Sequence, residues 1–396
     1  MKQNSKTKPS SKAKPAKSKA KTPVKQNSKA PIKAPSKASL KPTSKTKQSV
    51  PLKTKASVKS TKPSTIKSTS KVKPKPPIKI KPKVAFYWCS SCGGCEETVV
   101  DLEEKILDVV AAVDIVFWPC AMDFKYDDVE AMPDQSITVS FINGAIRSSE
   151  QEEIAHLLRK KSQIVIAFGA CAYMGGIPAL ANLKSKAGIL ERSYLKSPTV
   201  INKEKTLPDE KKLPQFYDTV YALDQVIDVD YYVPGCPPTS ALLAQVVTLL
   251  LKGQLPPKGS VVGAKQSLCA TCDRNSSKPD DLKTSVVKRI YQIQADPDKC
   301  FLAQGILCMG PATRAGCEGP CVSGNMPCTG CFGPLDGQDQ GAKLIGAFGG
   351  FHTAETEKQV QEMVDSIPDP AGTFYRYGLS KSLLGSKRSN NKEGRS

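Results

Sequence analysis

Fourteen cysteines lie in this chain of 396 residues, and all of them come after position 83. Most stand in C-x-x-C pairs or at short spacings, and the clearest pairs are Cys92/Cys95, Cys269/Cys272 and Cys328/Cys331. Two thiolates two residues apart can bind one metal centre from a single tight turn. Disulfide frameworks and structural zinc sites also use paired cysteines. The distribution therefore favours bound iron and sulfur, with disulfides and zinc as the alternatives.

The start of the chain argues against disulfides. Met1 opens a polar run rich in lysine, without the apolar segment that a secretory signal peptide needs. Thiols in the cytosol stay reduced. No apolar run reaches membrane-spanning length, since residues 241–251 are too short and are interrupted by Gln245. We therefore expect a cytoplasmic protein without a transmembrane segment.

Residues 1–83 differ in composition from the rest of the chain. They hold 26 lysines but no arginine, acid, aromatic residue or cysteine. Such a segment buries too little apolar surface to offset the entropy lost on ordering, so we expect a disordered basic tail. Its composition fits a solvated linker, and it also fits weak contact with nucleic acid, an acidic partner or an anionic membrane. Residues 84–396 hold 32 basic and 37 acidic side chains, a net charge of −5.

The middle of the chain alternates between strand and helix patterns. We expect strands at 84–88, 113–118, 136–142, 163–168 and 226–233, and helices from 96 to about 110, at 149–161 and at 240–252. Strands that alternate with helices imply an α/β fold with a parallel, doubly wound sheet, which we place at residues 84–257. Ligands of such sheets bind at the carboxyl ends of the strands.

Four cysteines follow this rule. Cys92 and Cys95 come after the first strand, Cys171 after the strand that ends at Phe168, and Cys236 after the strand that ends near Val233. Three loops that are far apart in sequence thus converge on one edge of the sheet and offer four thiolates. This number fits an iron-sulfur cluster. A single buried cysteine such as Cys171 also fits a small core residue.

Eight further cysteines fall within 63 residues, where strand and helix periodicity fades: Cys269, Cys272, Cys300, Cys308, Cys317, Cys321, Cys328 and Cys331. Eight thiolates make two sites of four ligands, either iron-sulfur clusters or zinc ribbons. We expect an irregular, cysteine-rich iron-sulfur domain at residues 258–380, followed by a polar, basic and disordered tail at 381–396.

Four strings carry a resemblance to a known family. They are YWCSSCGGCEE at 87–97, FGACA at 168–172, PGCPP at 234–238 and CMGPATR at 308–314. Together they resemble the small subunit of cytosolic nickel-iron hydrogenases, of the methyl-viologen-reducing type that partners heterodisulfide reductase. The resemblance implies a flavodoxin-like first domain and an electron-transfer role. Nickel, iron and hydrogen chemistry would then reside on a separate large subunit.

The resemblance also implies three 4Fe-4S clusters with a fixed set of ligands. Cys92, Cys95, Cys171 and Cys236 match the proximal cluster, nearest the nickel site. Cys269, Cys272, Cys300 and Cys308 match the distal cluster, and Cys317, Cys321, Cys328 and Cys331 match the medial one. The respiratory branch of the family has a histidine at the position of Cys269 and only three medial cysteines. This chain departs from that branch at both places.

The implied partners are the large subunit and an electron-accepting subunit, such as a ferredoxin-like or heterodisulfide reductase-linked protein. Two alternatives share the scaffold: the small subunit of a sulfhydrogenase and that of a deazaflavin-coenzyme-reducing hydrogenase. An alternative of another class is a zinc-ribbon protein that binds nucleic acid through the basic tail. Cys89 and Cys120 are left over. We expect Cys89 to be a spectator thiol and Cys120 to be a buried structural thiol, although Cys120 could also lie near the same edge of the sheet. Glu96 and Glu97 fit a proton-transfer role, but also the ordinary preference for acids in the first turn of a helix.

Overall fold

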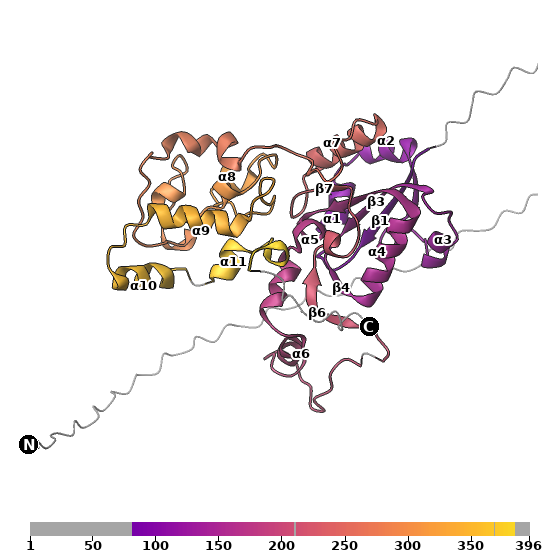
Figure 1. Cartoon of the computed structure of the whole chain (residues 1–396), viewed down its shortest axis with the longest axis horizontal. Helices are drawn as coiled ribbons and strands as arrows, with labels where there is room; N and C mark the ends of the chain where they lie inside the picture. The colour runs from indigo at the N-terminus through magenta and orange to yellow at the C-terminus, as the bar shows by residue number, and fades with distance from the viewer. Residues whose placement is uncertain (1–80, 210, 368, 385–396) are drawn as a thin grey trace, which may run out of the picture. The chain divides into compact units, whose positions relative to one another are not determined.

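A five-stranded parallel sheet forms the first part of the computed structural model, which describes residues 81–209, 211–367 and 369–384 (Figure 1). Its strands are β1 (Lys83–Trp88), β2 (Asp114–Phe117), β3 (Ile137–Asn143), β5 (Ser162–Phe168) and β7 (Tyr231–Val233). They run in the order β2-β1-β3-β5-β7, and all pairs are parallel. In chain order of these strands this is the 2-1-3-4-5 arrangement of flavodoxin-like folds. The predicted doubly wound fold is therefore confirmed.

Helices cover both faces of this sheet, as the two buried clusters show. The helices α1 (Gly94–Val100), α2 (Lys105–Ala112) and α7 (Ser240–Leu251) pack on one face, where Phe86 and Phe141 are buried. The helices α3 (Tyr126–Glu130) and α4 (Ser149–Lys161) pack on the other, where Ala85 and Val165 are buried. Helix α4 begins and ends where its pattern predicted, because Ser148 caps its start and Leu158 lies on its buried face.

Two predicted elements differ in the structure. The helix expected from Glu96 onward is split into α1 and α2, because Glu103 adopts a left-handed backbone with φ 54° while Leu102 turns into the core. The strand expected at 226–233 is reduced to β7. Its first half instead continues the turn of the 3-10 helix η2 (Leu223–Gln225), since the amides of Val226 and Ile227 bond back to Leu223.

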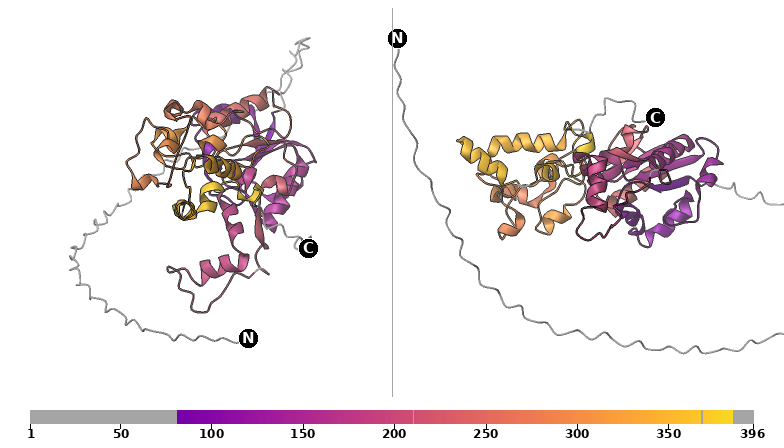
Figure 2. Two further views of the ribbon diagram at one scale, coloured as in Figure 1. Left: turned by 60° about the vertical axis from the view of Figure 1, so that its left-hand side comes forward. Right: turned by 90° about the horizontal axis from the view of Figure 1, so that it is seen from below.

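The pattern did not predict a short antiparallel ribbon, whose first strand comes before Cys171 and whose second strand lies between Cys171 and Cys236. It consists of β4 (Ile146–Ser148) and β6 (Phe216–Tyr221). Between β5 and β6 in sequence lie α5 (Ala170–Met174), the 3-10 helix η1 (Ile177–Leu183) and α6 (Lys186–Tyr194). Residues 184–209 and 211–215, between η1 and β6, extend away from the sheet (Figure 2).

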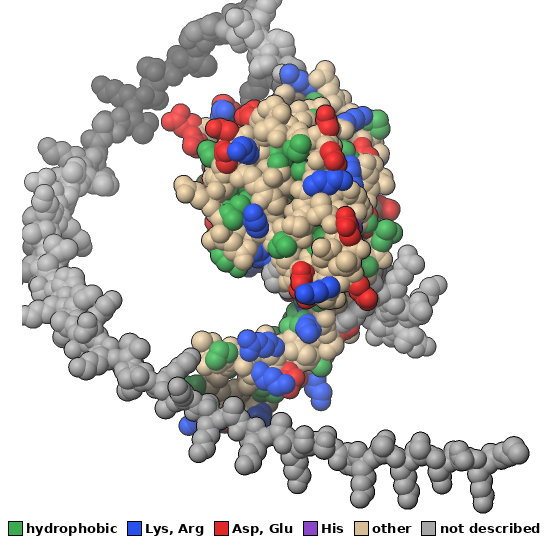
Figure 3. Space-filling model, turned by 90° about the vertical axis from the view of Figure 1, so that its left-hand side faces the viewer, with side chains coloured by type: hydrophobic (Ala, Val, Ile, Leu, Met, Phe, Trp, Pro, Cys, Tyr) green, Lys and Arg blue, Asp and Glu red, His purple; other side chains and the backbone are tan. Residues whose placement is uncertain are grey.

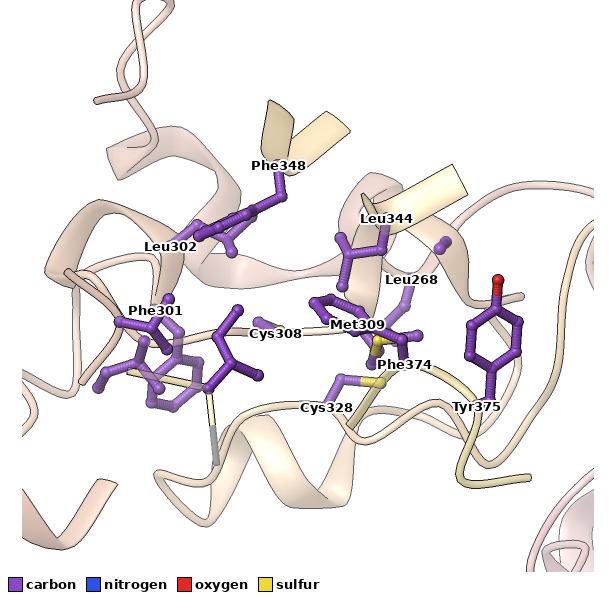
Figure 4. Packing of buried hydrophobic residues seen from close by; sticks show 14 of the residues in the cluster. Leu268, Phe301, Leu302, Cys308, Met309, Cys328, Leu344, Phe348, Phe374 and Tyr375 are labelled. Atoms are coloured by element: carbon purple, nitrogen blue, oxygen red, sulfur yellow. The ribbon is translucent and has the colours of Figure 1, made fainter. Parts of the chain in front are cut away.

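The cysteine-rich part is more regular than expected. It contains α8 (Pro320–Ser323), α9 (Gln340–Phe351), α10 (Glu357–Asp365), α11 (Pro370–Phe374), the short 3-10 helices η3 (Leu268–Thr271), η4 (Asp273–Ser277), η5 (Ile290–Gln292), η6 (Leu302–Gln304) and η7 (Gly310–Ala312), and η8 (Leu379–Lys381). The expectation that helical periodicity fades after residue 258 was wrong for α9, whose buried face of Gly341, Leu344 and Phe348 is disguised by its glycines. The side chains of Leu344 and Phe348 pack with Leu302 and Phe374 in a buried cluster (Figure 4).

Both tails fall mainly outside the described residues. The basic tail expected at 1–83 does so up to residue 80, whereas Lys83 already belongs to β1. The C-terminal tail expected at 381–396 does so from residue 385, whereas Lys381 ends η8 and forms an ion pair with Asp224. No helix in the described part of the chain is long and apolar enough to span a membrane.

Candidate metal centres

Three strand ends bring the first four cysteines together. Cys95 lies in the first turn of α1, just after Gly93, whose φ of 87° lets the chain turn sharply away from β1. The loops after β5 and β7 are tied to each other, because the amide of Gly169 donates to the carbonyl of Val233 at 2.8 Å and that of Ala170 donates to Gly235 at 2.6 Å. The loop with Cys171 therefore lies beside the loop with Cys236, as the sequence predicted.

The thiols of this set are close enough to perturb one another. Burial raises the pKa of Cys95, and the neighbouring thiolates of Cys171, Cys236 and Cys92 raise it further. Burial, followed by Cys236 and Cys92, raises the pKa of Cys171 to about 12. Four thiolates can share such a place only when a positive centre compensates their charge, and binding that centre releases their protons.

Glycines keep the space beside these thiols free. A side chain at Gly169 would collide with the Cys95 sulfur, and one at Gly176 would come within 2.5 Å of the Cys171 sulfur. Only a residue without a Cβ leaves room at these two positions. The donors and the space around them therefore fit an iron-sulfur group.

The second set consists of Cys269, Cys272, Cys300 and Cys308, and the four line one small cavity. Cys269 and Cys272 lie on and just after η3. Burial raises the pKa of Cys269 to about 12, and the thiolates of Cys308, Cys300 and Cys272 contribute to the rise, whereas Lys278 lowers it. The fold thus brings these four cysteines, which span 40 residues of sequence, around one space.

The third set consists of Cys317, Cys321, Cys328 and Cys331. Burial raises the pKa of Cys331 to about 12, and Cys317, Cys236 and Cys321 raise it further. Burial also raises the pKa of Cys328, on which Cys308 acts more strongly than Cys331. Because Cys331 is near Cys236 of the first set and Cys328 is near Cys308 of the second, the third set lies between the other two.

Backbone contacts support this order. The amide of Met309, next to Cys308, donates to the carbonyl of Cys328 at 2.9 Å. Cys331 also interacts with the backbone of Cys236. In the described ranges, no group of three or more Cys, His, Asp or Glu side chains is placed to hold one metal ion.

The two remaining cysteines lie apart from these sets. Cys89 is buried in the cluster on the α4 face of the sheet, whereas Cys95 is buried on the α7 face. The spectator role of Cys89 stays a prediction. The expectation that Cys120 is buried was wrong: this thiol is exposed, at the surface beside the carboxyl group of Glu96, with which it interacts.

Sequence reasoning missed how deeply Glu96 is enclosed. Its side chain is buried and accepts hydrogen bonds from the indole of Trp118 and the amide of Asn143. Burial raises the pKa of Glu96. The hydrogen bonds from Trp118, Cys120 and Asn143 act in the opposite direction but do not outweigh burial. Glu97 is exposed. The adjacent acids looked alike in the sequence, and only the positions of Trp118 and Asn143 in the fold distinguish them.

A second missed residue is Arg314, a fully buried cation. Its guanidinium donates to the carbonyl of Ala264 at 2.8 Å and to the carboxylate of Asp336. It also interacts with Tyr173, two residues after Cys171. Arg314 belongs to the CMGPATR string and precedes Cys317 by three residues, so a signal was present, although its role was not.

Comparison with known proteins relates this chain to the subunits of hydrogenases. Residues 92–250 match the family described as NADH ubiquinone oxidoreductase, 20 Kd subunit. The iron-sulfur subunit of the F420-non-reducing hydrogenase of Archaeoglobus profundus is 38% identical over 316 residues, which cover 77% of this chain and 98% of that protein. An F420-non-reducing hydrogenase subunit of Methanothermobacter marburgensis is 39% identical over 75% of this chain and 94% of its own length.

More distant similarities extend to other hydrogenases. The delta subunit of sulfhydrogenase 2 from Pyrococcus furiosus is 26% identical over 62% of this chain and 83% of that protein. A solved structure of an NAD+-reducing [NiFe]-hydrogenase in the H2-reduced state aligns with a TM-score of 0.41 and 27% identity, covering 44% of this chain and 94% of that one. The chain belongs to the family of iron-sulfur subunits of F420-non-reducing hydrogenases. The family named by resemblance is thus confirmed.

Proposed function

We propose that this chain is the electron-transfer small subunit of a nickel-iron hydrogenase. Electrons from hydrogen oxidation on a separate large subunit would pass through this chain to an acceptor subunit. The observation that carries the proposal is the succession of the three thiol sets, in which Cys331 adjoins Cys236 and Cys328 adjoins Cys308. Relatives that are 33–39% identical over about three quarters of the chain are named as hydrogenase subunits, which supports the same role.

Each set would hold one 4Fe-4S cluster. The proximal ligands are Cys92, Cys95, Cys171 and Cys236, the medial ligands are Cys317, Cys321, Cys328 and Cys331, and the distal ligands are Cys269, Cys272, Cys300 and Cys308. A bound cluster supplies reversible uptake of one electron at a time. Because all three sets are complete with four thiols, three clusters are proposed.

The chain's own contribution is to hold, orient and shield these groups. The backbone around Gly310 and Cys328 interacts with the Cys308 sulfur, and that around Gly330 interacts with the Cys328 sulfur. Hydrogen bonds to a ligand sulfur stabilise the thiolate and raise the reduction potential of the group it binds. Burial of Cys95, Cys308 and Cys328 excludes water from one side of each site.

The acceptor is proposed to be a ferredoxin-like or heterodisulfide reductase-linked protein, and the location to be cytoplasmic. The division into a flavodoxin-like domain at 84–257 and an iron-sulfur domain at 258–380 also stays a proposal. The tail at 1–83 is proposed to be a solvated linker, with weak contact to nucleic acid or another anionic surface as its alternative. Salt titration of DNA binding with and without the tail distinguishes these two roles.

Electron paramagnetic resonance of the purified native complex under hydrogen tests the function. We expect reduced iron-sulfur signals to develop with hydrogen as the only reductant, and to be absent when the large subunit is removed. Dithionite provides the control, because it reduces the clusters in either preparation. Clusters that dithionite reduces but that hydrogen leaves oxidised in the intact complex would contradict the proposed role.

A further inference from the structure

A segment between two proposed proximal ligands has no core of its own. It comprises residues 183–215, here called the arm, which begin at the end of η1 and lead through α6 to β6. From Leu183 to Asp218, none of the described residues is buried. Helix α6 buries no side chain either. An ordered segment of this length without burial carries the entropic cost of ordering without the usual compensation.

Polar contacts hold the arm in shape instead. The side-chain amide of Asn202 donates to the carbonyl of Tyr194 at 3.1 Å and to that of Thr206 at 2.8 Å, and its oxygen accepts from the Thr206 amide at 3.1 Å. Ser185 caps the start of α6. At the base, the amide of Lys186 donates to Asp218 of β6 at 2.6 Å. The backbone of the arm is therefore shaped before any partner arrives.

The arm exposes aliphatic side chains that find no core in the described structure. Ile201 is 88% exposed, Leu213 54% and Leu183 52%, and Val200 and Leu207 are exposed as well. Single exposed apolar residues are ordinary, but several on one segment that has no core of its own make this segment a candidate for contact with another molecule.

The charge of the arm is opposite to that of the body that carries it. Residues 183–215 hold eight basic and four acidic side chains, a net charge of +4, whereas residues 84–396 as a whole carry −5. Figure 3 shows lysine and arginine side chains gathered over the projection at the bottom of that view. A basic surface with aliphatic residues fits an acidic protein surface that has an apolar centre. The four acids and the spread of the aliphatic residues beyond one short helix disfavour an anionic membrane.

The root of the arm points to which partner this is. The 3-10 helix η1 follows directly on α5, which carries Cys171, and Gly176 at their junction lies against the Cys171 sulfur. The single 3-10 helix η1 therefore links the first thiol set to the base of the arm. Under the proposed function, which this inference presupposes, that end of the chain faces the large subunit.

We propose that the arm at residues 183–215 is a clamp that binds an acidic surface with an aliphatic centre on the catalytic large subunit. Aliphatic contacts at Ile201 and Leu213 hold the partner, and the lysines attract it electrostatically and set its orientation. Binding through this surface weakens as ionic strength rises.

The test is retention of the large subunit by the tagged full-length chain, purified from cells that make the native complex. The double variant I201D/L213D should retain at least about tenfold less large subunit, since two charges replace aliphatic contacts worth more than about 1.4 kcal/mol together. The variant K203E/K205E should bind more weakly at low salt and lose part of the salt dependence. The matched control V360D/V364D alters two exposed residues of α10 and should retain the large subunit normally.

Iron content per chain separates loss of the clamp from loss of the fold, because an exposed arm can change without loss of clusters. Undiminished retention of the large subunit by I201D/L213D would overturn the proposal. Loss of the acceptor subunit alone would do the same. So would binding of the wild-type chain to phosphatidylserine-containing vesicles, if the variant abolishes that binding. A wild-type chain that retains no nickel-iron large subunit would overturn the proposed function together with the clamp. Equal retention by wild type and variant overturns the clamp alone.

Discussion

Cys89 and Cys95 illustrate how little residue spacing alone says about a role. They belong to one C-x-x-C-x-x-C run, yet Cys89 is buried on the α4 face of the sheet and Cys95 on the α7 face. Period-two alternation along β1 decides the side that Cys89 takes, whereas Cys95 lies after the turn at Gly93, in the first turn of α1.

Replacing Cys95 by Ser should therefore remove about four irons per chain, while replacing Cys89 by Ser should remove none. The Cys89 variant loses only a small buried thiol, which acts there as a core residue. Iron analysis of the purified chains measures both, with the wild type as reference. Loss of four irons from the Cys89 variant would assign that thiol to a cluster.

Asp230 is a second residue whose role depends on its surroundings. It is buried beside β5, where its carboxylate accepts from Arg159 at 2.6 Å, from Lys258 at 2.6 Å and from the amide of Val165 at 2.8 Å. Burial alone would raise its pKa, but the bonds from Lys258 and Arg159 outweigh burial and lower it. A carboxyl group with a lowered pKa stabilises the fold above its unfolded pKa of about 3.9, and this contribution is lost as pH falls through the folded pKa.

Asp230→Asn should lower the free energy of unfolding by about 2 kcal/mol, because it leaves two cations without their carboxylate while keeping an acceptor for Val165. The loss should be equal at pH 5.5 and pH 8, since both lie above the folded and the unfolded pKa. Thermal melting of the loaded chain at the two pH values measures this. A difference that shrinks towards pH 5.5 would show that the folded pKa is not lowered.

At the scale of elements, the sequence predicted what local periodicity controls. Strands β1, β3 and β5 and the helices α4 and α7 agree with their patterns within a few residues. The break at Glu103 and the shortening of β7 were not predictable, because they depend on where Leu102 and Ile227 find space in the core. The ribbon of β4 and β6 was missed because its partners are about 70 residues apart.

The last described element connects both parts of the fold. Leu379 of η8 is buried in the cluster of the cysteine-rich part, while the hydroxyl of Ser380 donates to Val220 beside the sheet at 2.9 Å. The next residue, Lys381, pairs with Asp224 and lies 5.1 Å from the centre of the Tyr232 ring. Such a segment stabilises the contact between the two parts.

Leu379→Ala should lower the free energy of unfolding by about 2–4 kcal/mol, because it removes a buried side chain that its neighbours cannot replace. The matched control is Leu383→Ala, at a residue that is 83% exposed, which should stay within about 0.5 kcal/mol. Melting temperatures of the two variants give the comparison. Equal effects would mean that η8 contributes no more than an exposed segment.

At the scale of the whole molecule, the order of the three thiol sets is the central result. Spacing along the chain gave the C-x-x-C pairs, since each is a local feature. It could not give the contact of Cys331 with Cys236 or that of Cys328 with Cys308, because these depend on how distant loops meet. Only the family resemblance implied that the last four cysteines form the middle site.

The most direct test of the account is the iron and acid-labile sulfide content of the purified native complex, determined per copy of this chain after the iron of the other subunits is subtracted. Three complete sets predict about twelve irons and about twelve sulfides, in a brown protein free of zinc. A count near four or eight would show that one or two sets hold no cluster. A colourless chain that contains zinc would contradict the electron-transfer role altogether.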